Sequence, residues 1–146
     1  MRYETAVPIG SGGMGEVYKA FDPVLKRWVA LKYPRWDRPG VAERFLREAR
    51  LQARVDHEGV CRVYEIGDDE GRSYIAMQYI EGRTLDVAAA EMSQREKVEV
   101  LRLAAEAVHA AHQTGLVHRD LKPHNIMVER EGASWRPYVM DFGLAR

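Results

Sequence analysis

The segment that decides the fold reads His118-Arg119-Asp120-Leu121-Lys122-Pro123-His124-Asn125. It brings a carboxylate, two cations and an amide together, and Pro123 rules out a continuous helix through them. Oxygen ligands and positive charges in this combination suit a site that handles phosphate and a hard metal ion. The segment therefore predicts a loop with a chemical role, and the rest of the chain is interpreted around it.

Composition narrows the class of protein. The chain has 146 residues, which is the length of one domain, and its 22 Lys and Arg balance its 22 Asp and Glu. No net field therefore favours nucleic acid or an anionic membrane. The single cysteine, Cys61, cannot form an internal disulfide. The N-terminus lacks the apolar run of a signal peptide, and no stretch is long enough to span a membrane. We expect a cytoplasmic protein.

In the first part of the chain the pattern of apolar residues is mostly that of strands, and in the second part it is mostly that of helices. We expect strands at residues 6–9, 17–21, 28–33, 60–66 and 73–79, and a helix at 41–55. Asp68-Asp69-Glu70-Gly71 predicts a hairpin turn between the last two strands. The expected architecture of this part is an antiparallel sheet of five strands with one inserted helix. This part ends at a linker near Gly82, so we expect domains at residues 1–81 and 82–146.

From Gly82 onward the periodicity is helical. Thr84 is a candidate cap for a short helix at 85–90. Ser93 and Glu96 form a capping box for a longer helix that Gly115 ends. Short strands follow at 126–128 and 138–140. The apolar face expected on the long helix consists of Val98, Leu101, Ala104, Ala105, Val108, Ala111 and His112.

A glycine cluster lies between the first two expected strands. Gly10-Ser11-Gly12-Gly13-Met14-Gly15-Glu16-Val17 fits the pattern G-x-G-x-x-G-x-V. In a dinucleotide-binding fold such glycines open a helix, but the residues from Glu16 to Phe21 favour a strand. The pattern is therefore that of a flap whose backbone N–H groups close over phosphates. A purely structural glycine-rich hairpin remains the alternative for this motif taken alone.

Lys32 and Glu48 are the two charged residues of interest in the first part. Lys32 ends an apolar strand, where it either reaches phosphate oxygens or points to solvent. Glu48 lies between Phe45 and Leu51 at helical spacing, so it can face the sheet and pair with Lys32. The simpler alternative for Glu48 is an exposed pair with Arg44.

The segment 118–125 resembles the H-R-D-L-x-x-x-N catalytic loop of protein kinases, and Asp141-Phe142-Gly143 resembles their D-F-G motif. With the glycine flap and Val29-Ala30-Leu31-Lys32, four motifs stand in the family order. The chain is identified as a member of the eukaryotic-type Ser/Thr protein kinases, most similar to the bacterial branch. The resemblance implies an α+β, protein-kinase-like fold: a complete small lobe followed by the first part of the helical large lobe.

The resemblance also implies roles for single residues in ATP-dependent phosphoryl transfer. Asp120 would orient the incoming hydroxyl, and Lys122 would neutralise charge on the moving phosphoryl group. Lys122 within this loop is typical of Ser/Thr kinases, so the expected acceptor is a Ser or Thr of a protein substrate. Asn125 and Asp141 would bind Mg²⁺, and Lys32 with Glu48 would position phosphate.

For ATP, the resemblance implies contacts along the flap and around the base. The residues implied are Ile9, Gly10, Ser11, Gly12, Gly13, Met14, Gly15, Val17, Ala30, Lys32, Met77, Gln78, Ile80 and Met127. Met77 would be the gatekeeper, and backbone groups of Gln78 and Ile80 would pair with the purine edge. His118 and Phe142 are expected to be packing residues. Arg119 would bind a phosphorylated activation loop.

Only three residues follow Gly143, so the sequence supplies no activation segment. We therefore expect the 146-residue chain by itself to be marginally stable and inactive, with self-association through the exposed large-lobe face. Two other functions are alternatives. A non-catalytic nucleotide-binding or interaction module is the main alternative. A small-molecule phosphotransferase of related fold fits the motifs poorly.

Overall fold

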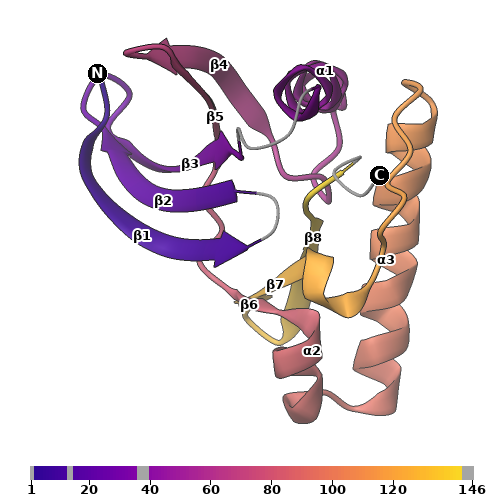
Figure 1. Cartoon of the computed structure of the whole chain (residues 1–146). Coiled ribbons are helices and arrows are strands. Elements are labelled where there is room, and N and C mark those ends of the chain that lie inside the picture. Colours follow the sequence, from indigo (N-terminus) through magenta and orange to yellow (C-terminus); the bar gives the residue numbers. More distant parts are fainter. Residues whose placement is uncertain (1, 13–14, 36–39, 143–146) are drawn as a thin grey trace. The chain divides into compact units, whose positions relative to one another are not determined.

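The computed structural model describes residues 2–12, 15–35 and 40–142 (Figure 1). Contacts divide the chain into two compact units. The first unit comprises Met1–Ala53 and Arg62–Tyr79, and the second comprises Arg54–Cys61 and Ile80–Arg146. In the part that the structure describes, no helix combines the length and the apolar character of a membrane span.

The first unit is a five-stranded sheet with one helix. Its elements are β1 (Glu4–Gly12), β2 (Gly15–Asp22), β3 (Arg27–Pro34), α1 (Val41–Ala53), β4 (Val63–Asp69) and β5 (Arg72–Gln78). The strand order is β1-β2-β3-β5-β4, and every neighbouring pair is antiparallel. Helix α1 packs against β3, β4 and β5. The predicted architecture of this part of the chain is confirmed.

Side chains and positive φ angles fix the hairpin turns of this sheet. The buried carboxylate of Asp22 accepts hydrogen bonds from the N–H groups of Val24 (3.0 Å) and Leu25 (3.1 Å), which closes the β2–β3 turn. In the β4–β5 turn, Glu70 and Gly71 have φ values of 53° and 84°. Two consecutive left-handed residues define the type I′ geometry that tight hairpins prefer, as the sequence predicts.

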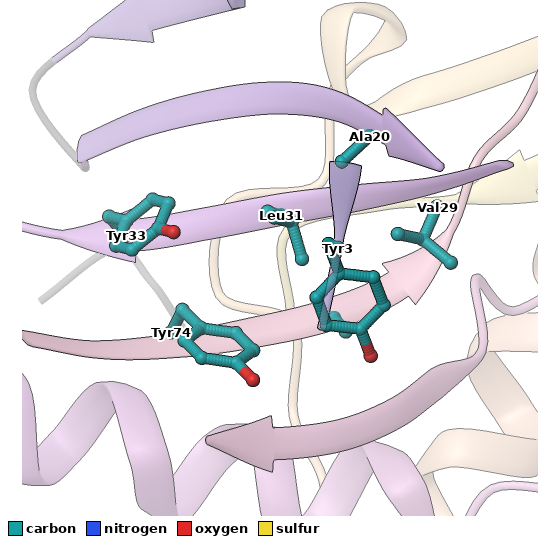
Figure 2. Close-up of a cluster of buried hydrophobic side chains, with 7 residues drawn as sticks. Tyr3, Ala20, Val29, Leu31, Tyr33 and Tyr74 are labelled. Carbon is teal, nitrogen blue, oxygen red and sulfur yellow. The ribbon is translucent and has the colours of Figure 1, made fainter. Parts of the chain in front are cut away.

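One face of the sheet carries an apolar cluster of small aliphatic and tyrosine side chains (Figure 2). Its buried members are Tyr3, Ala20, Val29, Leu31, Tyr33, Tyr74 and Ala76. The rings of Tyr3 and Tyr74 meet edge to face with centroids 6.0 Å apart. Because side chains alternate along a strand, Val29, Leu31 and Tyr33 on this face leave Ala30 and Lys32 on the other.

The second unit combines helices with a small sheet. Its elements are β6 (Arg83–Thr84), α2 (Leu85–Ala88), the 3₁₀ helix η1 (Ala89–Glu91), α3 (Gln94–His112), the 3₁₀ helix η2 (Pro123–Asn125), β7 (Ile126–Glu131) and β8 (Ser134–Val139). The strands are ordered β6-β7-β8, and α3 packs along β8. The capping box is present as predicted: Ser93 Oγ accepts from the Glu96 N–H and Glu96 Oε1 from the Ser93 N–H, both at 3.1 Å.

The strand predicted at 60–66 is partly wrong. Strand β4 begins at Val63, whereas Val60 forms a parallel bridge with Val139 in the second unit. The N–H of Val139 donates to the Gly59 carbonyl (2.7 Å), and the N–H of Cys61 donates to the Val139 carbonyl (3.2 Å). The segment after α1 therefore pairs with β8, and an apolar run alone does not show which strand it joins.

The apolar face predicted for α3 is also partly wrong. Val98 and Leu101 are 60% and 54% exposed. The buried face consists of Val100, Ala104, Ala107 and Ala111. The helix carries two apolar stripes at helical spacing, and the stripe with small side chains is the one that allows close approach to β8. The two short strands predicted after the loop are longer than expected, because they form the continuous β7–β8 hairpin.

Candidate functional site

The segment 118–125 forms a structured loop that ends in η2. Pro123 occupies the first position of η2, where its fixed φ is compatible with a helix and its missing N–H costs no hydrogen bond. The N–H of Asn125 donates to the Lys122 carbonyl at 2.9 Å. Arg119 has φ 70°, a left-handed conformation that non-glycine residues adopt only where their surroundings impose it. The backbone of this loop therefore has a defined conformation.

Three predicted site residues meet inside this loop. The amide nitrogen of Asn125 donates to the carbonyl of Asp120 at 2.8 Å and lies 3.3 Å from its Oδ2. Lys122 Nζ lies 3.5 Å from the same Oδ2. Asn125 is buried, whereas the side chains of Asp120 and Lys122 are about half exposed. The loop thus holds one carboxylate between an amide and an ammonium group and leaves it accessible.

His118 anchors the loop to the end of β8. Its Nδ1 accepts from the N–H of Asp120 at 3.1 Å, so Nε2 carries the proton and donates to the carbonyl of Met140 at 2.6 Å. The imidazole also packs on Phe142, with ring centroids 4.8 Å apart, and both side chains are buried. Both are packing residues, as the sequence predicts.

Asp141 follows this anchor directly. The N–H of Met140 donates to the Asn125 carbonyl at 2.8 Å, which brings the residue before Asp141 against Asn125. Asp141 has φ 55°, a second left-handed non-glycine residue in the same region. Among the described residues, no group of three or more His, Cys, Asp and Glu side chains forms a metal site. Gly143 lies outside the described residues.

The glycine motif forms a strand–loop–strand arrangement in the first unit. β1 and β2 pair through Gly10↔Val17 and Gly12↔Gly15, so the glycines do not open a helix and the dinucleotide alternative is excluded. Gly15 has φ 133°, and a Cβ there would overlap the carbonyl oxygen of Tyr33. Two residues of the motif, Gly13 and Met14, lie outside the described residues.

Strand register places four predicted nucleotide-binding residues on one face of the sheet. Val17 pairs with Lys32, and Ala30 pairs with Met77. Directly paired residues project to the same side, and so do residues two apart on one strand, so Val17, Ala30, Lys32 and Met77 share a face. Ile9 lies at a bulge in β1 and is exposed.

Lys32 and Glu48 are both buried, on β3 and α1 respectively. Lys32 Nζ lies 6.0 Å from the ring centroid of Phe45, which is one turn before Glu48 on α1. Arg47 Nη2 approaches Glu48 Oε1 at 3.5 Å. The solvated position that the sequence left open for Glu48 is therefore wrong, because the residue lies on the buried side of the helix.

The remaining predicted residues lie at the end of β5 and on β7. The N–H of Gln78 donates to the Arg62 carbonyl (2.8 Å), and its side-chain oxygen accepts from the Arg62 N–H (3.2 Å). Met127 alternates with the buried Ile126 and Val128, so it projects from the opposite face of β7. Ile80 is buried in the second unit. A pocket of about 430 Å³ in that unit, lined by Leu103 and Trp135 among others, includes none of the predicted residues.

Sequence reasoning missed the hydrogen bonds that position these groups. Neither the double contact between Gln78 and Arg62 nor the bond from His118 to Met140 has a local sequence signature, since the partners are 16 and 22 residues apart. Within the loop, the bond from Asn125 to Asp120 spans only five residues. Pro123 and the short spacing are the signals that could have suggested it.

Comparison with known proteins agrees with this geometry. Residues 3–146 match the family model described as protein kinase domain. The chain therefore belongs to the protein kinase family. Members of this family use ATP and Mg²⁺ in general and act on proteins, and the predicted resemblance and fold are confirmed.

Several similar proteins come from bacteria. The chain is 38% identical over 150 residues to the serine/threonine-protein kinase pkn2 of Myxococcus xanthus, covering 99% of this chain and 18% of that protein. It is 41% identical over 155 residues to the serine/threonine-protein kinase PknB of Mycobacterium tuberculosis, covering 99% and 24%. The crystal structure of the M. tuberculosis PknI kinase domain superposes with a TM-score of 0.82 at 30% identity, covering 99% of this chain and 61% of that one. The chain thus spans less than a quarter of the length of these curated relatives.

Proposed function

We propose that this chain takes part in the transfer of the γ-phosphate of ATP to Ser or Thr hydroxyls of proteins. The observation that carries the proposal is the arrangement of Asp120, Lys122 and Asn125 in one loop, joined through Met140 to Asp141. Phosphoryl transfer depends on positioning and charge neutralisation more than on covalent chemistry. A rigid loop with one accessible carboxylate, one cation and metal-binding oxygens supplies both.

Asp120 has the role of orienting the acceptor hydroxyl and accepting its proton. Asn125 holds the backbone and approaches the carboxylate of Asp120, which fixes the side chain without burying it. Lys122 lies beside that carboxylate, where its ammonium group is placed to neutralise charge on the group being transferred. This pair is the basis for proposing a Ser or Thr acceptor.

Asn125 and Asp141 are the proposed protein ligands of Mg²⁺. Because the amide nitrogen of Asn125 donates to Asp120, the amide oxygen is oriented away from Asp120 and is the atom that can bind a cation. Mg²⁺ is typically held by one or two protein oxygens together with water and phosphate oxygens, so this small donor set fits it. When bound, the ion neutralises phosphate charge.

In the first unit, the shared face of Val17, Ala30, Lys32 and Met77 is the proposed surface for the nucleotide. Lys32 is placed to contact phosphate oxygens, and Glu48 is its proposed counter-ion, since both are buried and Phe45 links them. The backbone of residues 10–15 is the proposed phosphate flap. The Gln78 carbonyl and backbone groups of Ile80 are the proposed partners of the purine edge, and Met127 and Ile9 are further proposed contacts of the base.

The test measures transfer of labelled phosphate from ATP by the complete protein encoded by the gene. Matched peptides carrying a single Ser, Thr or Tyr serve as acceptors, with and without Mg²⁺. We expect Mg²⁺-dependent labelling of the Ser and Thr peptides and not of the Tyr peptide. Mg·ATP binding with no transfer to any acceptor would contradict the proposal and support the alternative of a nucleotide-binding module.

A further inference from the structure

Lys19 lies between two aromatic rings in the first unit. Its Nζ is 4.6 Å from the ring centroid of Trp28 and 4.5 Å from that of Tyr79. An ammonium group at this distance from a ring face is attracted by the ring quadrupole, and here two rings act on one cation. The rings come from different places, since Trp28 is on β3 and Tyr79 follows the end of β5.

Strand register explains how the three residues meet. Lys19 pairs with Ala30, and Trp28 is two residues before Ala30 on the same face of β3. Val29 pairs with Gln78, and the antiparallel direction of the strands brings the preceding residue on β3, Trp28, toward the residue after β5, Tyr79. Lys19 therefore projects from the nucleotide face described above. Trp28 remains 45% exposed, so burial alone does not account for its position.

Tyr79 lies within the segment that is proposed to bind the purine edge. It stands between Gln78 and Ile80, whose backbone groups are the proposed partners of the purine edge, and it is the last residue of the first unit before the chain enters the second. Beyond β5 the strand ladder no longer fixes its backbone. A side-chain anchor at Tyr79 restricts the dihedral angles of both of its neighbours, which lowers the entropic cost of presenting them to a ligand.

We propose that Lys19 is a positioning residue for Tyr79. By holding Tyr79, it keeps the backbone of residues 78–80 in the conformation that can form hydrogen bonds with adenine. The inference rests on the proposed function and extends it to base selection. Adenine presents a donor at N6 and an acceptor at N1, whereas guanine presents an acceptor at O6 and a donor at N1. A backbone held in one conformation distinguishes the edge of adenine from that of guanine. A mobile backbone distinguishes the two bases less well.

The test is the dissociation constants of ATP and GTP, measured by calorimetry on the complete protein. For Lys19→Gln we expect ATP binding to weaken about two- to fivefold, the range that one exposed cation–π contact corresponds to. GTP binding should change less, so the preference for ATP falls. Lys19→Arg should restore wild-type values, because a guanidinium also stacks on aromatic rings. Lys97→Gln, which removes an exposed lysine on α3, is the matched control.

A second pair of variants tests the ring. Tyr79→Phe keeps the ring face and should behave like wild type, whereas Tyr79→Leu should reproduce the effect of Lys19→Gln. An unchanged ATP-to-GTP ratio in Lys19→Gln, or equal losses in Lys19→Gln and Lys19→Arg, would overturn the inference. Lys32→Met distinguishes a failure of this inference from a failure of the proposed function. If Lys32→Met weakens both nucleotides and Lys19→Gln neither, only the role of Lys19 fails; if the wild type binds neither nucleotide, both proposals fail.

Discussion

The imidazole of His118 joins the loop of residues 118–125 to the residue before Asp141, with Nε2 donating to the Met140 carbonyl at 2.6 Å. Its other nitrogen accepts from the backbone N–H of Asp120 at 3.1 Å. One buried ring therefore sets the backbone on both sides of the proposed site. The carboxylates of Asp120 and Asp141 depend on this bridge for their relative position, although His118 has no proposed role in chemistry.

His118→Phe should keep the packing on Phe142 and remove both hydrogen bonds. Leaving the Met140 carbonyl and the Asp120 N–H unpaired should lower the free energy of unfolding by about 1–3 kcal/mol. We expect kcat to fall while the Kd for ATP changes little, because the groups that move are those of the transfer step. Chemical denaturation and steady-state kinetics measure the two effects. The control is His124→Phe, an exposed histidine of the same loop; equal losses in both variants would refute the bridge.

Lys32→Met should reduce kcat/KM for ATP by at least about 100-fold, since a charge that contacts phosphate contributes most in the transition state. Methionine fills a similar volume beside Phe45 but leaves the buried Glu48 without its proposed counter-ion, so the melting temperature should also fall. A double-mutant cycle with Glu48→Gln tests the proposed pair, because the second substitution should add little to the first. Additive effects would show that Lys32 and Glu48 act independently.

Gly15→Ala should disrupt the glycine flap. The new Cβ would overlap the Tyr33 carbonyl, and φ 133° is unfavourable for alanine. We expect weaker ATP binding and a lower melting temperature. Gly10→Ala is the matched control for the melting temperature, since a Cβ there meets no atom within 4 Å. The assigned strand pairing at Gly15 would be wrong if its variant were as stable as the control.

Glu96 should make stability depend on pH. Hydrogen bonds from the Ser93 N–H and from the Trp135 indole (2.7 Å) hold the pKa of Glu96 below its ordinary value, although burial opposes this shift. A carboxylate whose pKa is lower in the folded state stabilises the protein above its unfolded pKa. That contribution disappears as pH falls through the lower folded value. The stability difference between wild type and Glu96→Gln should therefore be largest near neutral pH and shrink below about pH 4.5.

Trp135→Phe tests how much the indole hydrogen bond to Glu96 contributes to this pH dependence. It keeps most of the ring but removes the Nε1 donor, so part of the pH dependence should be lost while the capping box remains. Denaturant titrations at a series of pH values compare the three proteins. A wild-type stability that falls no more steeply than that of Glu96→Gln in this pH range would show that the carboxylate has no such role.

Local features of the fold were predictable from the sequence. The Ser93–Glu96 capping box, the β4–β5 turn and the helix carrying Glu48 depend on residues a few positions apart, and each is present. The site loop was predictable for the same reason, because Asp120, Lys122 and Asn125 lie within one short segment.

Partners distant in sequence were not predictable. Val60 belongs to a strand-like apolar run, yet it bridges to Val139 rather than extending β4. The two apolar stripes of α3 are alike in period, and only the approach of β8 decides that Ala104 is buried and Leu101 is not. The bond between Glu96 and Trp135 joins residues 39 apart. Tertiary packing determines such choices, and a single sequence does not encode which partner approaches.

The most direct test of the central claim is the comparison of wild type with Asp120→Asn in the complete protein. Transfer of γ-phosphate to a Ser/Thr peptide and binding of Mg·ATP are measured on the same samples. Because Asn cannot accept the hydroxyl proton, we expect transfer to fall by a factor of about 10²–10⁴, with the Kd for Mg·ATP within a few-fold of wild type. Undiminished transfer by Asp120→Asn would contradict the account.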